Sequence, residues 1–187
     1  MVIEIIERVL TYRPEQLAAW CSGDKSLTPE FAGIPAIVRN QPRYHFAETL
    51  TLRHYHESGG WIGFAHYALG PQFPRSQRRA RGRMVAEEII PRESLEHLRE
   101  LRSDPAIASS GRGEPDLFLY KGPGIFRFVE VKKDGDRLRD AQRVCIAQII
   151  AVLGCGVDVV RVHEAGRMYV PKTHKLELGG TTDSGAA

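Results

Sequence analysis

Two short apolar runs in the middle of the chain predict a β-hairpin. Residues 117–120 and 125–131 are rich in leucine, valine and aromatic side chains, and Lys121-Gly122-Pro123-Gly124 separates them. Apolar runs of this length on either side of a glycine-containing turn are typical of two antiparallel strands. We therefore expect this hairpin to form the centre of a sheet.

Helical spacing of apolar residues predicts further elements on both sides of the hairpin. It indicates helices over residues 44–57, 93–102 and 138–153, and Gly154 is suited to end the last of them. A valine-rich run at 157–162 then predicts a largely buried strand beside the hairpin. Strands and helices that follow one another in this way favour an α/β fold.

The first part of the chain has a less regular pattern. Ile3, Ile6, Val9 and Leu10 keep helical spacing up to Pro14, so we expect short helices there. The prediction is a single α/β domain with a small mixed sheet flanked by helices. Its parts are a helical N-terminal extension at 1–43, a core domain at 44–172 and a disordered tail at 173–187.

Composition agrees with one globular domain and excludes several classes. The 187 residues suffice for a sizeable core, and no apolar run approaches the ~20 residues that span a bilayer. The N-terminal stretch lacks the basic start and small-residue cleavage site of a signal peptide, so we expect the cytoplasm. The three cysteines include no Cys-x-x-Cys pair, which leaves a structural zinc knuckle unsupported and favours free thiols.

The histidines at 45, 54, 56 and 66 do not form a zinc motif. His54 and His56 are two positions apart, and such residues do not share a face of a helix. We interpret each histidine as a hydrogen-bonding residue that is partly buried, or as a phosphate contact.

Candidate chemistry lies in the predicted hairpin. Side chains of a strand alternate between its faces, so Glu130 and Lys132 should point to one side and Val131 to the other. Antiparallel pairing across the turn would bring Asp116 close to Glu130. Two carboxylates and the backbone carbonyl of Val131 are the hard oxygen ligands that Mg²⁺ prefers. The alternative is an exposed strand face on which Glu130 and Lys132 pair with each other.

At these residues the chain resembles the VRR-NUC (virus-type replication-repair nuclease) branch of the PD-(D/E)xK nucleases. The matching segments are Gly113-Glu-Pro-Asp116 with Leu117, Val129-Glu130-Val131-Lys132, Asp136-Arg137-Leu138 followed by Gln142, and Gly156-Val-Asp-Val-Val160. The resemblance implies a restriction-endonuclease-like core with Asp116, Glu130 and Lys132 as the catalytic set. It also implies that Gln142 lies near them, although the amphipathic pattern alone would make Gln142 a solvated polar residue.

The resemblance further implies another acid on the helix that leads into the sheet. Glu48 lies in the middle of the predicted 44–57 helix and is our candidate for a metal ligand. The alternative for Glu48 is a surface residue of a half-exposed helix. Glu87 and Glu88 compete for the role, because the position after Gly-Trp-x-Gly that carries an acid in some family members is Ala65-His66-Tyr67 here.

The distribution of charge says more than the net charge of +3. Five arginines crowd into nine residues, which creates a local positive potential for a phosphate backbone. The members of this run are Arg75, Arg78, Arg79, Arg81 and Arg83, and further candidates for contact with DNA are Arg137, Arg139 and Arg143 beside the site. The alternative for the run is a solvated loop whose arginines pair with the following glutamates.

The resulting hypothesis is a Mg²⁺- or Mn²⁺-dependent deoxyribonuclease. The resemblance implies DNA as the partner and repair, replication or phage biology as the setting. Two alternatives stay open, namely an antibacterial effector with an immunity protein as a second partner, and a non-catalytic DNA-binding or docking module on the same fold. Known repair relatives carry this module beside DNA-binding domains, so a homodimer is also a candidate assembly.

Overall fold

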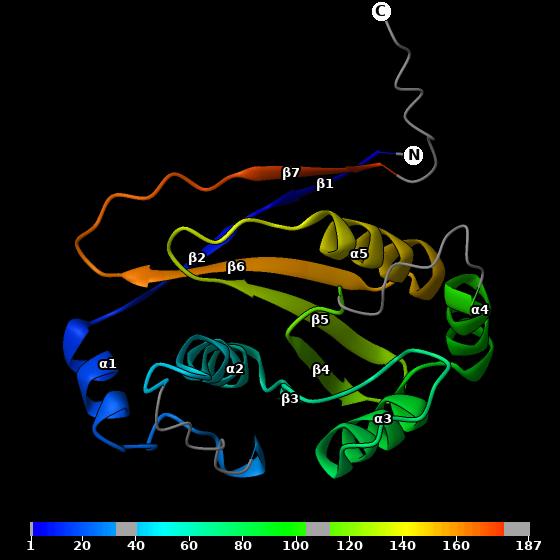
Figure 1. Ribbon diagram of the computed structural model, residues 1–187, viewed down its shortest axis with the longest axis horizontal. Helices are drawn as coiled ribbons and strands as arrows, with labels where there is room; N and C mark the ends of the chain where they lie inside the picture. Colours follow the sequence, from blue (N-terminus) through cyan, green and yellow to red (C-terminus); the bar gives the residue numbers. More distant parts are fainter. Residues whose placement is uncertain (1, 33–40, 104–112, 178–187) are drawn as a thin grey trace, which may run out of the picture.

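A five-stranded mixed sheet forms the centre of the computed structural model, which describes residues 2–32, 41–103 and 113–177 (Figure 1). The strand order is β2-β6-β5-β4-β3. Strands β2, β6 and β5 run parallel to one another, whereas β4 is antiparallel to both β5 and β3. The sheet strands are β2 (Arg8–Tyr12), β3 (Ile62–Phe64), β4 (Leu117–Gly122), β5 (Ile125–Lys132) and β6 (Gly156–Glu164).

Helices cover both faces of this sheet. They are α1 (Pro14–Cys21), α2 (Phe46–Gly59), α3 (Gln77–Ile89), α4 (Arg92–Ser103) and α5 (Asp140–Leu153), and a short 3₁₀ helix spans Glu30–Ala32. In Figure 1, α5 and α2 lie on opposite sides of the central strands. None of the helices in the described part of the chain is long and apolar enough to cross a bilayer.

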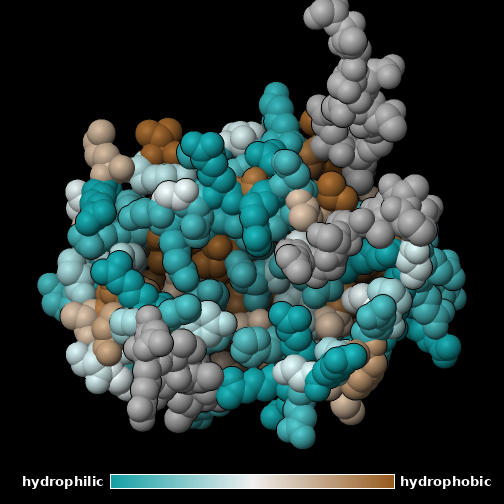
Figure 2. Space-filling view, in the orientation of Figure 1, coloured by the Kyte–Doolittle hydropathy of each residue, from teal (hydrophilic) through white to brown (hydrophobic). Residues whose placement is uncertain are grey.

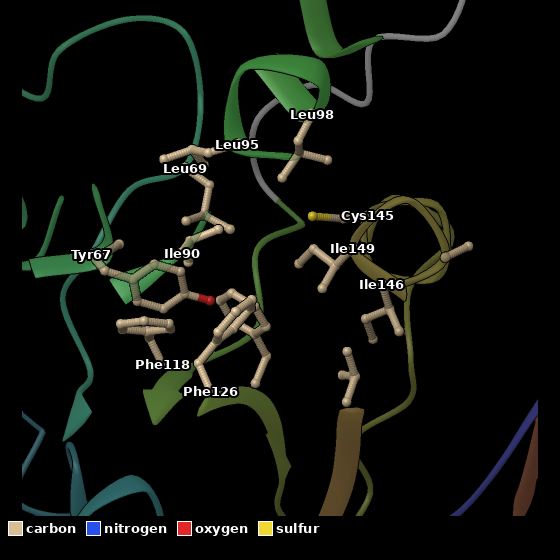
Figure 3. Packing of buried hydrophobic residues seen from close by; sticks show 14 of the residues in the cluster. Tyr67, Leu69, Ile90, Leu95, Leu98, Phe118, Phe126, Cys145, Ile146 and Ile149 are labelled. Atoms are coloured by element: carbon tan, nitrogen blue, oxygen red, sulfur yellow. The ribbon is translucent and has the colours of Figure 1, made fainter. Parts of the chain in front are cut away.

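Alternation along the hairpin divides the buried apolar residues into two clusters. Phe118 and Phe128 pack against α3, α4 and α5 on one face, and Leu117 and Val129 pack against α1 and α2 on the other. Figure 3 shows the first cluster, with Tyr67 next to Phe118 and three side chains of α5 opposite them. The predicted hairpin, the 44–57 and 93–102 helices, the core helix and the strand after it are therefore confirmed as elements.

The N-terminal segment differs from the prediction, because residues 2–12 form strands and not helices. Strand β1 (Val2–Ile6) pairs with β7 (Thr173–Glu177) in a separate antiparallel sheet, and β2 joins the central sheet beside β6. Ile5 is 8% exposed and Ile6 is 67% exposed, so the side chains alternate with the period of a strand. The prediction of helices was wrong here because Ile3, Ile6, Val9 and Leu10 fit helical spacing, while the strand partners that decide the conformation are more than 140 residues away.

The structure corrects the predicted start of the C-terminal tail and decides against one alternative for the arginine run. Residues 173–177 belong to β7, so a disordered tail does not begin at 173, and residues 178–187 lie outside the described part. For the arginine run, the alternative of a solvated loop is wrong from residue 78 onward, because these residues lie on helix α3. The predicted division of the chain at residue 43 stays a prediction, although β2 already contributes to the central sheet.

Candidate functional site

The register of the β4–β5 hairpin brings the three motif residues together. Leu117 pairs with Val129, so Asp116 lies where β4 begins and next to Glu130. The Asp116 carboxylate accepts a hydrogen bond from the backbone N–H of Val131, with 2.8 Å between Oδ2 and N. Because the N–H and C=O of one strand residue point to the same edge, the Val131 carbonyl also points to the side of Asp116.

Glu130 and Lys132 form a buried ion pair on the α5 face of the sheet. Their side chains are 1% and 7% exposed, and Lys132 Nζ lies 2.6 Å from Glu130 Oε1. Gln142 in the first turn of α5 bridges the pair, since its amide nitrogen donates to Glu130 Oε1 and its oxygen accepts from Lys132 Nζ at 2.9 Å. The Gln142 oxygen also accepts the backbone N–H of Arg139 at 3.1 Å, which ties the start of α5 to the site.

Gln142 is therefore not the solvated helix residue that its pattern alone would suggest. It is 4% exposed, and both ends of its amide contact the ion pair. The structure thus brings Asp116, Glu130, Lys132 and Gln142 into one cluster.

The pKa values of both carboxyl groups in the cluster are raised above their ordinary values. Burial raises the pKa of Glu130 to about 8, the charge of Asp116 adds to this, and the charge of Lys132 opposes it. Burial also raises the pKa of Asp116 to about 6, with a further contribution from Glu48 and opposition from the Val131 N–H and the nearby lysines.

Two carboxylate oxygens near the cluster have no hydrogen-bond partner among the described residues, and a cation could bind to them. Glu130 Oε2 and Glu48 Oε2 are buried and have no hydrogen-bond partner within the described residues. Such atoms are uncommon in folded proteins and suggest a missing ion or water. No three His, Cys, Asp or Glu side chains of residues 2–32, 41–103 and 113–177 converge closely enough to hold a metal alone. Mg²⁺ commonly takes one or two carboxylates and completes its shell with water and phosphate oxygens, so the donors present fit it.

The structure separates the three candidates for the additional acid. Glu48 lies in the first turn of α2, 3.7 Å from Lys133 Nζ, and its charge acts on Asp116. Glu87 is instead bound by two guanidinium groups, since its Oε1 lies 2.9 Å from Arg83 Nε and also contacts Arg99. Glu88 is exposed on α3. Glu48 is thus the acid of the three that is placed to act with Asp116.

Residues 114 and 115, which directly precede Asp116, are held by contacts that the sequence did not indicate. Tyr67 donates its buried hydroxyl to the carbonyl of Pro115 at 2.6 Å. Glu114 Oε1 accepts the backbone N–H of Leu69 at 2.8 Å and pairs with Arg102 at 3.1 Å. These partners are 12 to 48 residues away from the motif, and no spacing rule connects them to it.

Gly113 allows the same segment to lie against α5. A Cβ atom at this position would lie 2.1 Å from the carbonyl oxygen of Ala141. Any side chain at 113 would therefore push the Asp116 strand away from the helix that carries Gln142.

The predicted DNA-binding arginines fall into two groups. Arg75, Arg78, Arg79 and Arg81 are exposed, as are Arg137 and Arg139, and Arg143 is half-buried and donates to the Lys175 carbonyl. Arg83 is 7% exposed and donates to the carbonyls of Gly70 and Gln72 as well as to Glu87. Arg83 therefore has an internal role that leaves it unavailable to a phosphate backbone.

These features define a class of protein, an α/β domain with a buried acid–acid–lysine cluster at the start of a central hairpin. The VRR-NUC domain model matches residues 69–164, which is just over half of the 187 residues. The chain belongs to this family, and the predicted family is confirmed. Asp116, Glu130, Lys132 and Gln142 lie inside the matched region, and Glu48 precedes it.

Two solved structures are similar to the chain. Both are crystal structures of paFAN1, one bound to 1nt 5'flap DNA with gap and one bound to 2nt 5'flap DNA with gap. The first is 24% identical, with a TM-score of 0.37, and the second is 21% identical, with a TM-score of 0.38. Each match covers 66% of this chain and only 23% or 21% of the paFAN1 chain. No curated protein matched.

Proposed function

We propose that the chain is a metal-dependent nuclease that hydrolyses phosphodiester bonds in DNA. The observation that carries the proposal is the convergence of Asp116, Glu130 and Lys132, two carboxyl groups and one ammonium group, in one buried cluster. Membership of the VRR-NUC family supports this class of reaction. We extend the proposal to the fold and interpret the domain as a restriction-endonuclease-like core.

The metal would be Mg²⁺ or Mn²⁺. Asp116 and Glu130 would hold it through carboxylate oxygens, together with the backbone carbonyl of Val131, and Glu48 would complete the site. Glu130 and Glu48 each have an oxygen without a hydrogen-bond partner among the described residues. When bound, such an ion polarises a phosphoryl oxygen and makes a bound water more acidic.

The protein's own groups would position the reactants. Lys132 Nζ is held by Glu130 and Gln142, so its ammonium group is fixed next to the carboxylates without rotamer freedom. There it can orient a water molecule and offset negative charge that develops on the phosphate. Gln142 holds both members of the pair from α5 and is a positioning residue.

A non-catalytic docking module is less well supported. Buried charged groups destabilise a fold unless they are compensated, and a docking module would not need a buried acid–acid–lysine cluster. Repair, phage and effector settings would share this chemistry, and an immunity gene beside the coding sequence would indicate an effector. The homodimer and the cytoplasmic location stay predictions.

A divalent-ion titration on a panel of duplex, flap and branched DNAs tests the proposed function. We expect cleavage of at least one substrate in Mg²⁺ or Mn²⁺, and none in Ca²⁺ or EDTA. Cleavage that persists in excess EDTA, or that is absent from the whole panel in both metals, would contradict the proposal.

A further inference from the structure

A cleft of about 410 Å³ lies next to the carboxylate cluster. It opens between the start of α2, strand β3 and helix α3. Its polar lining includes Glu48, His45, His66, Arg78 and Arg81, and Phe31 and Phe64 are among its apolar residues. Glu48 therefore connects the cleft with the proposed metal site.

His45 has an unusual conformation at the wall of this cleft. It is the one non-glycine residue of the described segments with a positive φ, and its φ of 63° and ψ of 2° are left-handed. The side chain is only 7% exposed, yet its Nε2 atom has no hydrogen-bond partner among the described residues. A left-handed conformation is unfavourable for most L-residues, and such outliers are concentrated at ligand sites.

Charged and hydrogen-bonding groups surround His45, and they include the acids Glu48 and Glu30 as well as the basic residues. Its ring contacts that of His66, with 5.2 Å between the centroids, and the charge of Arg78 acts on both rings. Gly82 allows α3 to lie close to the backbone of His66, because a Cβ atom at position 82 would be 2.0 Å from the His66 carbonyl oxygen. Arg78 is one helical turn before Gly82, so it is carried to the same side of α3.

We infer that the cleft binds one phosphate group of a nucleic-acid strand beside the metal site, through His45, His66 and Arg78. The inference deepens the proposed function and rests on it. A phosphate oxygen would supply the acceptor that the buried His45 nitrogen lacks, and Arg78 would supply charge. Phe31 and Phe64 offer apolar surface to the attached sugar or base, and the volume is within the range of small-ligand sites. The arginines make a second cation a less suitable occupant.

Binding of thymidine 5′-monophosphate in EDTA tests the inference without cleavage or metal. The change is His45→Asn, because asparagine accepts the left-handed conformation and lacks the imidazole ring. His54→Asn is the matched control, since His54 is exposed further along the same helix. We expect His45→Asn and Arg78→Gln each to weaken binding about tenfold, measured by NMR titration, while His54→Asn leaves the affinity unchanged.

A merely structural role for His45 predicts a different result. His45→Asn would then lower the melting temperature and leave nucleotide affinity unchanged, and that outcome overturns the inference. Titration shifts confined to residues around Arg137 and Arg139 would overturn it as well. Unchanged affinity together with normal metal-dependent cleavage would contradict the phosphate site alone and leave the proposed nuclease intact.

The phosphate group could be a terminal phosphate or an internal phosphodiester of the strand. Competition of short oligonucleotides with thymidine 5′-monophosphate distinguishes the two. An oligonucleotide with a 5′-phosphate that competes better than its 5′-hydroxyl counterpart indicates a terminal phosphate. Equal competition indicates an internal phosphodiester. In both cases His45→Asn should weaken the competition, and equal competition by wild type and variant would contradict the inference.

Discussion

Asp116 and Glu130 combine burial with mutual repulsion. Each pKa is raised, to about 6 and to about 8, and burial is the main cause for both. Their ordinary values are 3.8 and 4.5, so the folded state binds protons that the unfolded state has already released. This contribution to stability is fully present below pH 4 and is lost as pH rises through about 6 and about 8.

A metal ion should reverse this loss, since it replaces the protons on the same oxygens. We expect 10 mM Mg²⁺ to raise the melting temperature by about 2–4 °C at pH 8.5 and by much less at pH 5. Calorimetry across pH 5 to 9 measures this. The range lies above the pH at which Glu7 titrates, because its hydrogen bonds to Tyr169, Arg161 and His174 outweigh burial and lower its pKa to about 2.

Glu130→Gln is the matched variant for this measurement. It removes one titrating group and keeps the shape of the side chain, so the metal-free protein should lose less stability between pH 5 and 8.5. A Mg²⁺ effect of equal size at both ends of the pH range would contradict this interpretation of the carboxylates.

Lys132 should be essential for cleavage and dispensable for folding near neutral pH. Lys132→Ala should lower the cleavage rate at least a hundredfold, on the order of the loss for a group that stabilises transition-state charge. Its removal would leave Glu130 without a counter-ion, but Glu130 can then take up a proton, so the fold should persist at pH 7. Rates from gel assays and circular dichroism check the two parts.

Lys133→Ala is the control for Lys132. Lys133 follows in sequence, has a side chain 47% exposed and lies 3.7 Å from Glu48. We expect an effect of less than about tenfold on the rate. Equal losses in the two variants would mean that general positive charge, and not the position of Lys132, supports the reaction.

The loop after β5 depends on a buried network of charged groups. Arg161 of β6 donates to the carbonyls of Lys133 and Asp136 and pairs with Glu7 at 2.8 Å. Glu7 also contacts His174 and Tyr169, so it connects the N-terminal strands with the C-terminal segment. The network thereby holds the loop that directly follows Lys132.

Breaking this pair should be strongly destabilising. Arg161→Met leaves a buried carboxylate without its main partner and should lower the free energy of unfolding by about 3–5 kcal/mol. The double variant Glu7→Leu/Arg161→Met should be more stable than the sum of the single losses predicts, by on the order of 2 kcal/mol. Urea denaturation measures both.

Arg8→Ala provides the comparison for this network. Arg8 pairs with Asp158 at 3.1 Å, but its side chain is 61% exposed, so the cost should be below about 1 kcal/mol. Additive losses in the Glu7 and Arg161 variants would contradict the view that the two groups stabilise each other.

Helix α3 should contribute to association with DNA through its exposed arginines. If Arg78, Arg79 and Arg81 contact phosphates, replacing them with alanine should flatten the slope of log affinity against log salt by roughly 2–3 units. Fluorescence anisotropy in Ca²⁺ measures binding with little or no cleavage. An unchanged slope would contradict phosphate contacts by α3. The residues that contact DNA would then be Arg137, Arg139 and Arg143.

Local pattern predicted some elements and not others, for a physical reason. The hairpin was predictable because two apolar runs of strand length flank a glycine-containing turn, and α5 because its apolar residues keep helical spacing up to Gly154. Strand β1 was not, since Ile3 and Ile6 fit helical spacing while Ile3 and Ile5 fit a strand. Pairing with β7 decides between them, and that partner lies at the other end of the chain.

At the scale of the whole molecule, the sequence predicted which residues lie together in the candidate site better than it predicted the contacts that support them. Glu130 and Lys132 could be placed by strand alternation and Asp116 by pairing across the turn, and both are local rules. Tyr67 and Arg102 could not, because their contacts with the 114–116 segment depend on how helices and loops pack. Strand order across the sheet is likewise set by long-range pairing.

The region matched by the family model contains only part of the elements around the candidate site. The matched region, 69–164, supplies the hairpin and α5, whereas Glu48 and β2 lie before it. The N- and C-terminal strands pair with each other. Residues outside the matched region therefore contribute to the proposed site and to the fold around it.

The face of the molecule in Figure 2 is largely hydrophilic, with hydrophobic residues in separate groups.

The most direct test of the central claim is the cleavage rate of labelled DNA as Mg²⁺ is varied, with wild type and Asp116→Asn compared on the best substrate of the panel. The account predicts that the wild-type rate saturates with Mg²⁺. Asp116→Asn should need much more metal and stay at least about a hundredfold slower at saturation, because one carboxylate ligand has become a neutral amide. A variant with the wild-type rate and the wild-type Mg²⁺ dependence would contradict the account.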